Sequence, residues 1–391
     1  MGYHSSSMNP VRGLQEKFRE LYGVAARVYR APGRVNLIGE HTDYNDGFVM
    51  PAAIGFYTWV AIAPRRDRRL LMHSENFGER REFDLDDPLP AALGHWSDYV
   101  RGVAVTLEKT GHRLDGANLL IQGEVPMGAG LSSSAAIEVA VGQALLDNSK
   151  ISIDRSSLAQ QCQRAENEFV GTRCGIMDQF VSCCGQAGHA LMLDCRSLFY
   201  RLLPLGGSVQ LVICNTLVKH DLASSAYNLR RAECEEAVKS LRRSLREIGA
   251  LRDVSLEELE SCGSELAATI YRRAKHVVSE NRRVQVAARA LELGDLTGFG
   301  QLMQESHRSL REDFEVSCEE LDRMVEIAFG VEGVYGARMT GGGFGGCTIN
   351  LVRSDCVEEF RSKMSLCYKQ ATGLVPEIYT CEAAQGVGEA F

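Results

Sequence analysis

The sequence is poor in several features that mark whole classes of protein. It has only nine prolines and two tryptophans in 391 residues, and aromatic residues make up 7%. No stretch approaches the roughly 18 consecutive apolar residues that a membrane-spanning helix needs. No run of lysine and arginine is longer than three and the net charge is −8, so the chain lacks the basic footprint of a nucleic-acid-binding protein. We therefore expect neither a membrane nor a nucleic acid as a partner.

The cysteines lack the spacing of a disulfide framework or a zinc site. All thirteen lie between Cys162 and Cys381 without a Cys-x-x-Cys pair, and the first residues contain no apolar region typical of a signal peptide. An odd count without a framework is typical of reduced thiols, which favours a cytoplasmic protein. We expect these cysteines to serve as small buried hydrophobic residues.

What is present is the patterning of a mixed α and β globular protein. Hydrophobic residues make up 45% and charged residues 24%, and the length suggests two domains. Apolar runs rich in β-branched residues predict strands, and apolar residues at helical spacing predict helices. The expected strands are 57–63, 119–121, 190–193, 209–214 and 347–352; the expected helices are 157–170, 227–248 and one opened by a capping box at residues 317–320.

The first half of the chain is strand-rich, whereas residues 227–328 are almost entirely helical in pattern. This shift places the expected domain boundary near Leu205, Gly206 and Gly207. The sequence therefore predicts two domains, residues 1–205 and 206–391.

Three glycine-rich segments hold most of the candidate functional residues. The first, residues 32–45 (PGRVNLIGEHTDYN), packs Arg34, Glu40, His41 and Asp43 around two glycines. So many polar side chains cannot all be buried without partners. They indicate either a surface turn with ordinary ion pairs or a polar ligand site, in which carboxylates accept hydrogen bonds from hydroxyl groups and the arginine faces an anion.

The second segment, residues 126–136 (PMGAGLSSSAA), follows an expected strand and leads into a helix of small residues. Glycines let the backbone approach a ligand, and a helix N-terminus offers free N–H groups and a positive dipole end to an anion. The alternative is an ordinary serine N-cap after a glycine turn. The segment is not a Walker A loop, because G-x-x-x-x-G-K-[ST] does not occur.

The third segment, residues 339–347 (MTGGGFGGC), formally contains the dinucleotide pattern G-x-G-x-x-G. That fingerprint must lie between a strand and the helix it opens, but here an expected strand follows. The segment is therefore either a loop that contacts a ligand or another loop, or a flexible tight turn.

Two isolated carboxylates lie between the second and third segments. Glu166 is next to the apolar stripe of the 157–170 helix, and Asp178 is flanked by apolar residues. An ordinary salt-bridged role and a role with a shifted pKa are both open for each of them.

In this order and spacing, the three segments resemble the motifs of the GHMP kinase family, and the first is similar to the specific galactokinase signature within it. The resemblance spans residues 30 to 350. It implies a two-lobed α+β GHMP kinase fold, with a strand-rich N-terminal lobe of ribosomal-S5-like topology, a helix-rich C-terminal lobe and the active site between them. It also implies ATP- and Mg²⁺-dependent phosphorylation of α-D-galactose at the C1 hydroxyl, giving α-D-galactose 1-phosphate and ADP, the first committed step of galactose catabolism (the Leloir pathway).

The resemblance further implies roles for individual residues. Asp178 would be the catalytic base, or an orienting charge, and Arg34 would lie beside it and stabilise developing charge. The residues implied to hold galactose are Glu40, His41, Thr42, Asp43, Gly175 and Tyr227. Those implied to hold ATP are Ser74, Trp96, Gly128, Ala129, Gly130, Leu131, Ser132, Ser133 and Ser134, and those implied to bind Mg²⁺ are Ser134 and Glu166.

Two other functions within the family's range are open. An N-acetylgalactosamine kinase shares most of the first motif but tends to carry an apolar residue where Thr42 stands, so Thr42 favours plain galactose. A non-catalytic regulator that senses galactose and ATP lacks residues of the second motif, whereas residues 132–136, Asp178 and Arg34 are all present here. We expect a monomer whose partners are galactose and ATP.

Overall fold

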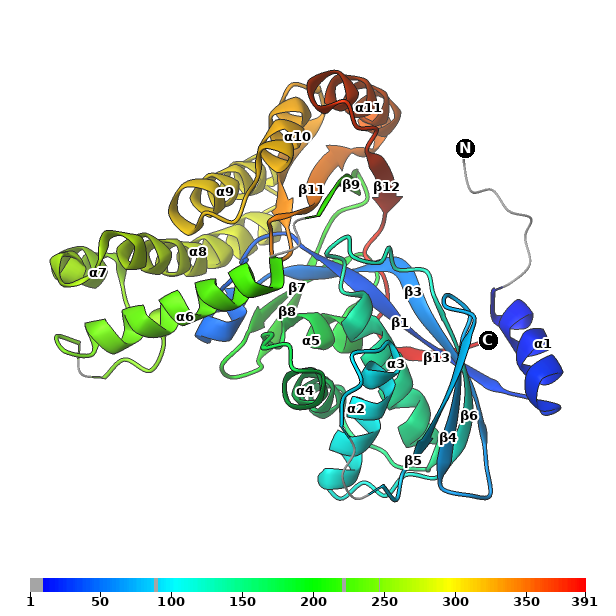
Figure 1. Ribbon diagram of the computed structural model, residues 1–391. Helices are drawn as coiled ribbons and strands as arrows, with labels where there is room; N and C mark the ends of the chain where they lie inside the picture. Colours follow the sequence, from blue (N-terminus) through cyan, green and yellow to red (C-terminus); the bar gives the residue numbers. More distant parts are fainter. Residues whose placement is uncertain (1–9, 88–90, 220–222, 246) are drawn as a thin grey trace.

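The structure is a computed structural model that describes residues 10–87, 91–219, 223–245 and 247–391. Its described part contains a larger sheet packed against helices and a second, helix-rich region built on a smaller sheet (Figure 1). The larger sheet has six strands in the order β13-β1-β3-β6-β4-β5, and all its neighbours are antiparallel except β4 and β6. Its strands are β1 (Arg27–Asn36), β3 (Pro51–Pro64), β4 (Arg69–Ser74), β5 (Glu79–Asp84), β6 (Ala117–Gly123) and β13 (Gly388–Ala390).

Strand β3 shows why this sheet is covered on both faces. Its residues alternate in direction, so Val60 and Ile62 join one core and Trp59 and Ala61 join another. The first core lies under α2 (Ser97–Lys109), α3 (Ser133–Asn148), α4 (Arg155–Ala165) and α5 (Met177–Cys184). The second lies under α1 (Pro10–Tyr22), which covers the opposite face (Figure 1).

The second region is built on a four-stranded antiparallel sheet in the order β10-β11-β9-β12. Its strands are β9 (Val209–Lys219), β10 (Val334–Thr340), β11 (Gly345–Arg353) and β12 (Glu377–Cys381). The helices around it are α6 (Ala223–Leu241), α7 (Leu256–Cys262), α8 (Ala268–Glu292), α9 (Leu296–Ser309), α10 (Glu319–Phe329) and α11 (Val357–Thr372). A further three-stranded sheet contains β2 (Phe48–Val49), β7 (His189–Asp194) and β8 (Tyr200–Pro204).

Six short helical segments complete the described elements. Two of them are π-helical continuations, η2 (Glu166–Val170) after α4 and η5 (Leu310–Phe314) after α9. The 3₁₀ turns are η1 (Asp43–Asn45), η3 (Leu251–Asp253), η4 (Gly263–Glu265) and η6 (Ser354–Cys356).

The apolar residues of the first glycine segment anchor it between the two regions. Val35, Leu37 and Ile38 are fully buried in a core that also contains Val284 of α8 and Ile349 of β11. Burying an aliphatic side chain of this size stabilises a fold by about 1.5–3 kcal/mol. The polar residues that follow, from residue 39 onward, are therefore held where the two regions meet.

All five expected strands are confirmed, but two of the expected helices differ from the structure. The segment 157–170 is α-helical only to Ala165, and the helix expected over 227–248 ends as α6 at Leu241. Residue 246 of that segment lies outside the described residues. The capping box at 317–320 is wrong: Cys318 is the N-cap of α10 and makes no side-chain cap, and the Ser317 hydroxyl donates to Asp322 instead.

Other expectations from the sequence fare differently. The division at residue 205 stays a prediction, and β13, which comes after it, pairs with β1 of the larger sheet. All thirteen cysteines are free thiols, and nine of them are buried as expected; Cys174, Cys195, Cys318 and Cys367 are half-buried. None of the helices formed by the described residues is long and apolar enough to cross a membrane.

Candidate active site

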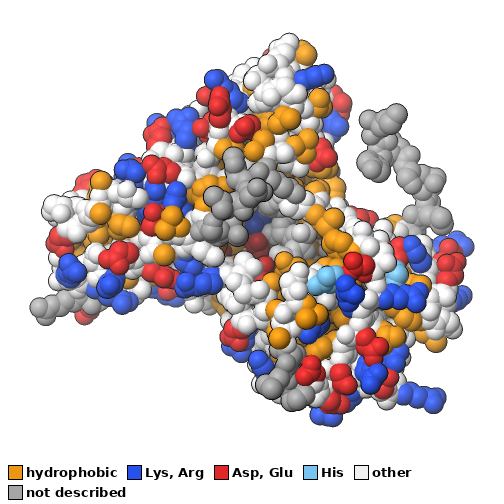
Figure 2. All heavy atoms as spheres, viewed as in Figure 1, with side chains coloured by type: hydrophobic (Ala, Val, Ile, Leu, Met, Phe, Trp, Pro, Cys, Tyr) orange, Lys and Arg blue, Asp and Glu red, His pale blue; other side chains and the backbone are white. Residues whose placement is uncertain are grey.

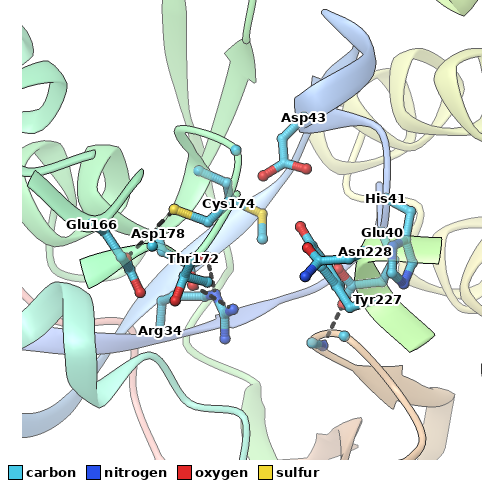
Figure 3. A pocket seen from close by; sticks show the side chains of 15 residues that line it. Arg34, Glu40, His41, Asp43, Glu166, Thr172, Cys174, Asp178, Tyr227 and Asn228 are labelled. Atoms are coloured by element: carbon cyan, nitrogen blue, oxygen red, sulfur yellow. Dashed lines mark hydrogen bonds and ion pairs between the residues drawn. The ribbon is translucent and has the colours of Figure 1, made fainter. Parts of the chain in front are cut away.

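A polar cavity of about 420 Å³ lies where the first and third glycine segments meet α5 and α6 (Figure 3). Figure 2 shows a recess in this part of the surface, between the two regions of the molecule. The cavity is lined by Arg34, Glu40, His41, Asp43, Glu166, Gly171, Thr172, Cys174, Gly175, Met177, Asp178, Tyr227, Asn228, Gly341 and Gly342. The structure thus gathers both expected catalytic residues and most of the expected sugar-binding residues in one place.

Arg34 and Asp178 form a two-pronged ion pair at the wall of this cavity. Arg34 Nε and Nη2 donate to Oδ1 and Oδ2 of Asp178, each at 2.8 Å, and Arg34 Nη1 donates to the Gly130 carbonyl at 2.6 Å. The Ser132 hydroxyl donates to Asp178 Oδ2 as well. Two parallel charge-assisted hydrogen bonds fix orientation as well as charge. The pair therefore holds the Asp178 carboxylate rigidly beside the second glycine segment.

Glu40 links the first glycine segment to the third. Its Oε2 accepts from Asn36 Nδ2 at 2.7 Å, and its Oε1 accepts from the backbone N–H of Gly341 at 2.7 Å. The buried guanidinium of Arg338 lies 3.4 Å from the same oxygen. Burial raises the pKa of Glu40, and Arg338 and Arg34 oppose this rise. The Glu40 carboxylate therefore fixes the position of the third glycine segment, and Glu40 also lines the cavity.

His41 and Tyr227 form an aromatic wall. His41 has a backbone φ of 63°, and its Nδ1 lies 2.7 Å from the Tyr44 hydroxyl. Its ring centroid lies 4.7 Å from that of Phe314 and 5.5 Å from that of Tyr227, and the ring also interacts with the backbone of Gly342. Burial lowers the pKa of His41 to about 3, so the ring is neutral. A neutral imidazole can donate one hydrogen bond and accept another, which suits a hydroxyl-bearing ligand.

Asp43 and Gly175 meet so closely that only glycine fits at the second position. A Cβ on Gly175 would lie 1.9 Å from Asp43 Oδ2. Burial, with the negative charge of Asp178 as the next cause, raises the pKa of Asp43 to about 7. The absence of a side chain at Gly175 lets the Asp43 carboxylate reach the cavity.

Glu166 begins the π-helical turn η2 and shares a donor with a second buried carboxylate. The amide Nε2 of Gln179 donates to Glu166 Oε2 at 2.5 Å and to Glu138 Oε2 at 3.0 Å. Burial, followed by the charge of Asp178, raises the pKa of Glu166 to about 7. Burial and the nearby Glu166 also raise the pKa of Glu138 well above its usual range. A π-helical turn at such a place is frequent at functional sites.

A second, smaller cavity of about 130 Å³ lies beside the start of α3. Four residues expected near ATP gather at its wall, namely Ser74, Trp96, Ser133 and Ser134. The rings of Trp96 and Phe77 lie nearly parallel, 8° apart in plane angle and 6.2 Å apart between centroids. This cavity thus combines a flat aromatic surface with serine hydroxyls at a helix N-terminus.

The glycine loop between the cavities contributes through its backbone. Gly128 and Gly130 have φ angles of 69° and 75°, which L side chains rarely adopt. The side chains of Ala129 and Leu131 are buried in the core shared by both regions, so they face away from any ligand. Because a Cβ on Gly341 would lie 3.1 Å from the Gly130 carbonyl oxygen, the second and third glycine loops contact each other.

Thr42, which was also expected at the sugar site, lies behind the cavity wall. Its side chain is fully buried and does not line the cavity. Its Oγ1 lies 2.8 Å from the Gly39 carbonyl and 2.6 Å from the Phe48 carbonyl. Thr42 therefore closes the turn that carries the neighbouring polar residues.

Several residues of the site were missed because nothing local distinguishes them. Cys174 lines the cavity with its Sγ 3.5 Å from Glu166 Oε2, although the thirteen cysteines carry no sequence signal. Glu138 looks like any charged residue of a helix, yet it is fully buried. Gln179 could have been predicted, because it directly follows the candidate catalytic residue Asp178 in the sequence.

Comparison with known proteins agrees with this geometry along the whole chain. Residues 16–64 match the galactokinase galactose-binding signature, 98–186 the GHMP kinases N terminal domain and 287–370 the GHMP kinases C terminal domain. Over 376 residues the chain is 49% identical to a galactokinase of Roseiflexus sp. (strain RS-1), covering 96% of each chain. It is 50% identical over 361 residues to a galactokinase of Chloroflexus aggregans, covering 92% of this chain and 93% of that one.

Solved structures give the same result. The crystal structure of Lactococcus lactis galactokinase complexed with galactose superposes with a TM-score of 0.94 at 40% identity, covering 98% of this chain and 100% of that one. The Methanococcus jannaschii mevalonate kinase has a TM-score of 0.66 at 17% identity, covering 92% and 99%, and supports the fold alone. The chain therefore belongs to the galactokinase branch of the GHMP kinase family.

Proposed function

We propose that this protein phosphorylates α-D-galactose at its C1 hydroxyl with ATP, giving α-D-galactose 1-phosphate and ADP. The observation that carries this proposal is the Arg34–Asp178 pair, which lies in a cavity lined by the galactose signature and is tied by Ser132 and Gly130 to the glycine loop. This arrangement brings a carboxylate for the sugar hydroxyl and a cation for the phosphoryl group to one point.

The side chains that line the first cavity are of the kinds that hydrogen-bond to sugar hydroxyls. Glu40 and Asp43 offer carboxylate oxygens, and His41 offers its neutral imidazole ring. Tyr227 closes the cavity from α6, with its ring 5.5 Å from that of His41. Carboxylates accept hydrogen bonds from hydroxyl groups, and a neutral histidine can donate one and accept another. We infer that the pyranose ring lies against the Tyr227 face, with its C1 hydroxyl toward Asp178.

ATP occupies the second cavity and the start of α3. The base stacks at the flat surface of Trp96 and Phe77. The phosphates then lie against the glycine loop and the first N–H groups of α3, a 16-residue helix whose N-terminus carries a partial positive charge. The Ser133 hydroxyl lies at the same place and can donate to a phosphate oxygen.

The residues expected to bind Mg²⁺ fit a hard cation. Ser134 hydrogen-bonds to Glu166, so a hydroxyl and a carboxylate oxygen meet between the two cavities. Within the described residues no group of three or more His, Cys, Asp and Glu side chains could hold a metal by itself. This suits Mg²⁺, which binds through one or two protein oxygens together with substrate phosphates. When bound, the ion supplies positive charge that neutralises the phosphate oxygens.

The protein's own residues act mainly by position and charge. Asp178 orients the C1 hydroxyl and accepts its proton as the oxygen bonds to phosphorus. Arg34 holds Asp178 in place and offers positive charge near the transferring phosphoryl group. Phosphoryl transfer has a loose transition state, so alignment and electrostatic stabilisation matter more than the strength of the base.

Replacing Asp178 by Asn tests the proposal. The amide keeps the shape but can neither take the proton nor pair with Arg34, so we expect kcat to fall by at least about a hundredfold. Calorimetry should show that galactose still binds. The control is Asp84→Asn, an exposed aspartate of β5, which should behave as the unaltered protein. Near-normal turnover in the Asp178 variant would overturn the assignment.

A further inference from the structure

Helix α8 presents a row of buried polar residues to the loop that carries Glu40 and His41. The row consists of His276, Glu280 and Asn281, followed by the apolar Val284 one turn later. Residues four apart lie on one face of a helix. A buried histidine and a buried glutamate on the core-facing side are costly unless each has partners, so their contacts are informative.

Glu280 holds the backbone of Gly39. Its Oε1 accepts from the Gly39 N–H at 2.8 Å and from the Ser306 hydroxyl at 2.6 Å, and its Oε2 accepts from Arg283 Nε at 2.6 Å. Burial opposes ionisation of this carboxyl, yet the nearby guanidinium groups of Arg283 and Arg338, together with the contact to His276, lower its pKa to about 2. The Gly39 N–H thus donates to a fixed, ionised acceptor.

His276 holds the backbone of the next residue, Glu40. Its Nε2 lies 3.1 Å from the Glu40 carbonyl oxygen, and its Nδ1 lies 2.9 Å from the Ser309 hydroxyl. Because the carbonyl can only accept, we assign the proton to Nε2. Backbone groups of two successive residues, the N–H of Gly39 and the C=O of Glu40, are therefore held by one helix.

The loop has little freedom to relax around these contacts. Gly39 has a φ of 101°, and a Cβ there would lie 2.8 Å from the Phe48 carbonyl oxygen and 2.9 Å from a methyl of Val284. Phe314 packs against both His276 and His41, with centroid distances of 4.6 and 4.7 Å. A shift of the α8 contacts would therefore move the peptides from which Glu40 and His41 project.

We propose that Glu280 and His276, neither of which lines the cavity, are positioning residues that set Glu40 and His41 in place for the sugar and so determine galactose affinity. This inference rests on the proposed function. It predicts that disturbing either residue weakens galactose binding while the ATP cavity, which these residues do not contact, keeps its affinity.

The test uses steady-state kinetics of the full chain with galactose and ATP varied in turn. Glu280→Gln removes the ionised acceptor, and we expect the galactose KM to rise by roughly tenfold or more, with kcat and the ATP KM within about threefold of the unaltered protein. His276→Ala should act in the same direction. His276→Gln should restore much of the loss, since its amide nitrogen can take the place of Nε2. The control is Glu292→Gln at the end of α8, where Glu292 pairs with Arg201 on the surface.

Thermal unfolding with and without galactose gives a second readout. The shift in Tm caused by galactose should shrink in Glu280→Gln and His276→Ala and be preserved in Glu292→Gln. An unchanged galactose KM, or an equal rise of both KM values, would overturn the inference. If Glu280→Gln does not fold, the comparison of His276→Ala with His276→Gln decides. Failure of the unaltered protein to turn over galactose would instead contradict the proposed function.

Discussion

The role of the two-pronged ion pair between Arg34 and Asp178 can be tested by a substitution that keeps the positive charge. Arg34→Lys retains a cation beside the carboxylate but replaces a rigid planar donor by a single ammonium on a flexible stem. Arg34 is buried and the Asp178 side chain is one quarter exposed, so water screens this pair only weakly. The substitution therefore separates the geometry of the pair from its charge.

The structure gives the size of the expected effect. Arg34 makes two hydrogen bonds to Asp178 and a third to the Gly130 carbonyl. A lysine ammonium can keep one of them, so one bond to the carboxylate and the bond to Gly130 are lost. With about 1.5 kcal/mol for each, the lower end for charged hydrogen bonds, the loss is about 3 kcal/mol, or roughly 150-fold in kcat/KM.

The assay is kcat/KM for galactose at saturating ATP, together with a single-turnover measurement that isolates the chemical step. A matched control is available, because Arg27 makes the same two-pronged pair with Glu389 on the surface, also at 2.8 and 2.8 Å. Arg27→Lys should leave kcat/KM unchanged. If kcat/KM of Arg34→Lys also stays within about fivefold of that of the unaltered protein, a positive charge alone suffices. The role given to the two-pronged geometry of the pair is then refuted.

Three further substitutions test other parts of the site. Gly175→Ala places a Cβ 1.9 Å from Asp43 Oδ2 and should raise the galactose KM by at least about tenfold in a sugar titration; an unchanged KM would mean that this contact is not needed. The pKa of Asp43 is raised to about 7, so between about pH 4 and 7 the folded protein binds more protons than the unfolded chain and its free energy of unfolding falls as pH rises. Asp43→Asn should therefore raise the Tm of the ligand-free protein at pH 8, with the gain vanishing toward pH 4, whereas a loss of stability at pH 8 would contradict this sign. Trp96→Ala should raise the ATP KM by roughly tenfold without changing the galactose KM, and equal effects on both would place the base elsewhere.

The local features of the fold could be read from the sequence, but contacts between distant segments could not. The strand over 57–63 was predictable because all of its residues except the half-buried Tyr57 are buried. The helix over 227–248 was overextended because Leu245 and Ile248 pack in the same core as Leu241, but from a turn in which Arg242 Nε bonds to the Ile248 carbonyl. Apolar residues at helical spacing indicate that side chains are buried. Residues in a turn can be buried in the same way as residues in a helix, so the spacing alone does not show where the helix ends.

The site was predictable where its residues belong to dense motifs. Arg34 and Asp178 are 144 positions apart, yet each carried a local signal, and the structure joins them. Glu280, His276 and Arg338 carried none, since a buried charge in a helix or strand has the same local sequence as a solvated one. Only the packing of α8 and β10 against the first glycine segment gives them their roles.

The identity of the phosphorylated atom tests the central claim most directly. The purified protein is incubated with ATP, Mg²⁺ and either galactose or N-acetylgalactosamine, and the position of the new phosphate is read by NMR. We expect phosphate on C1 of galactose, with the α configuration, and much slower product formation from N-acetylgalactosamine. Phosphate on C6, comparable rates for the two sugars, or binding of galactose and ATP without any product would contradict the account.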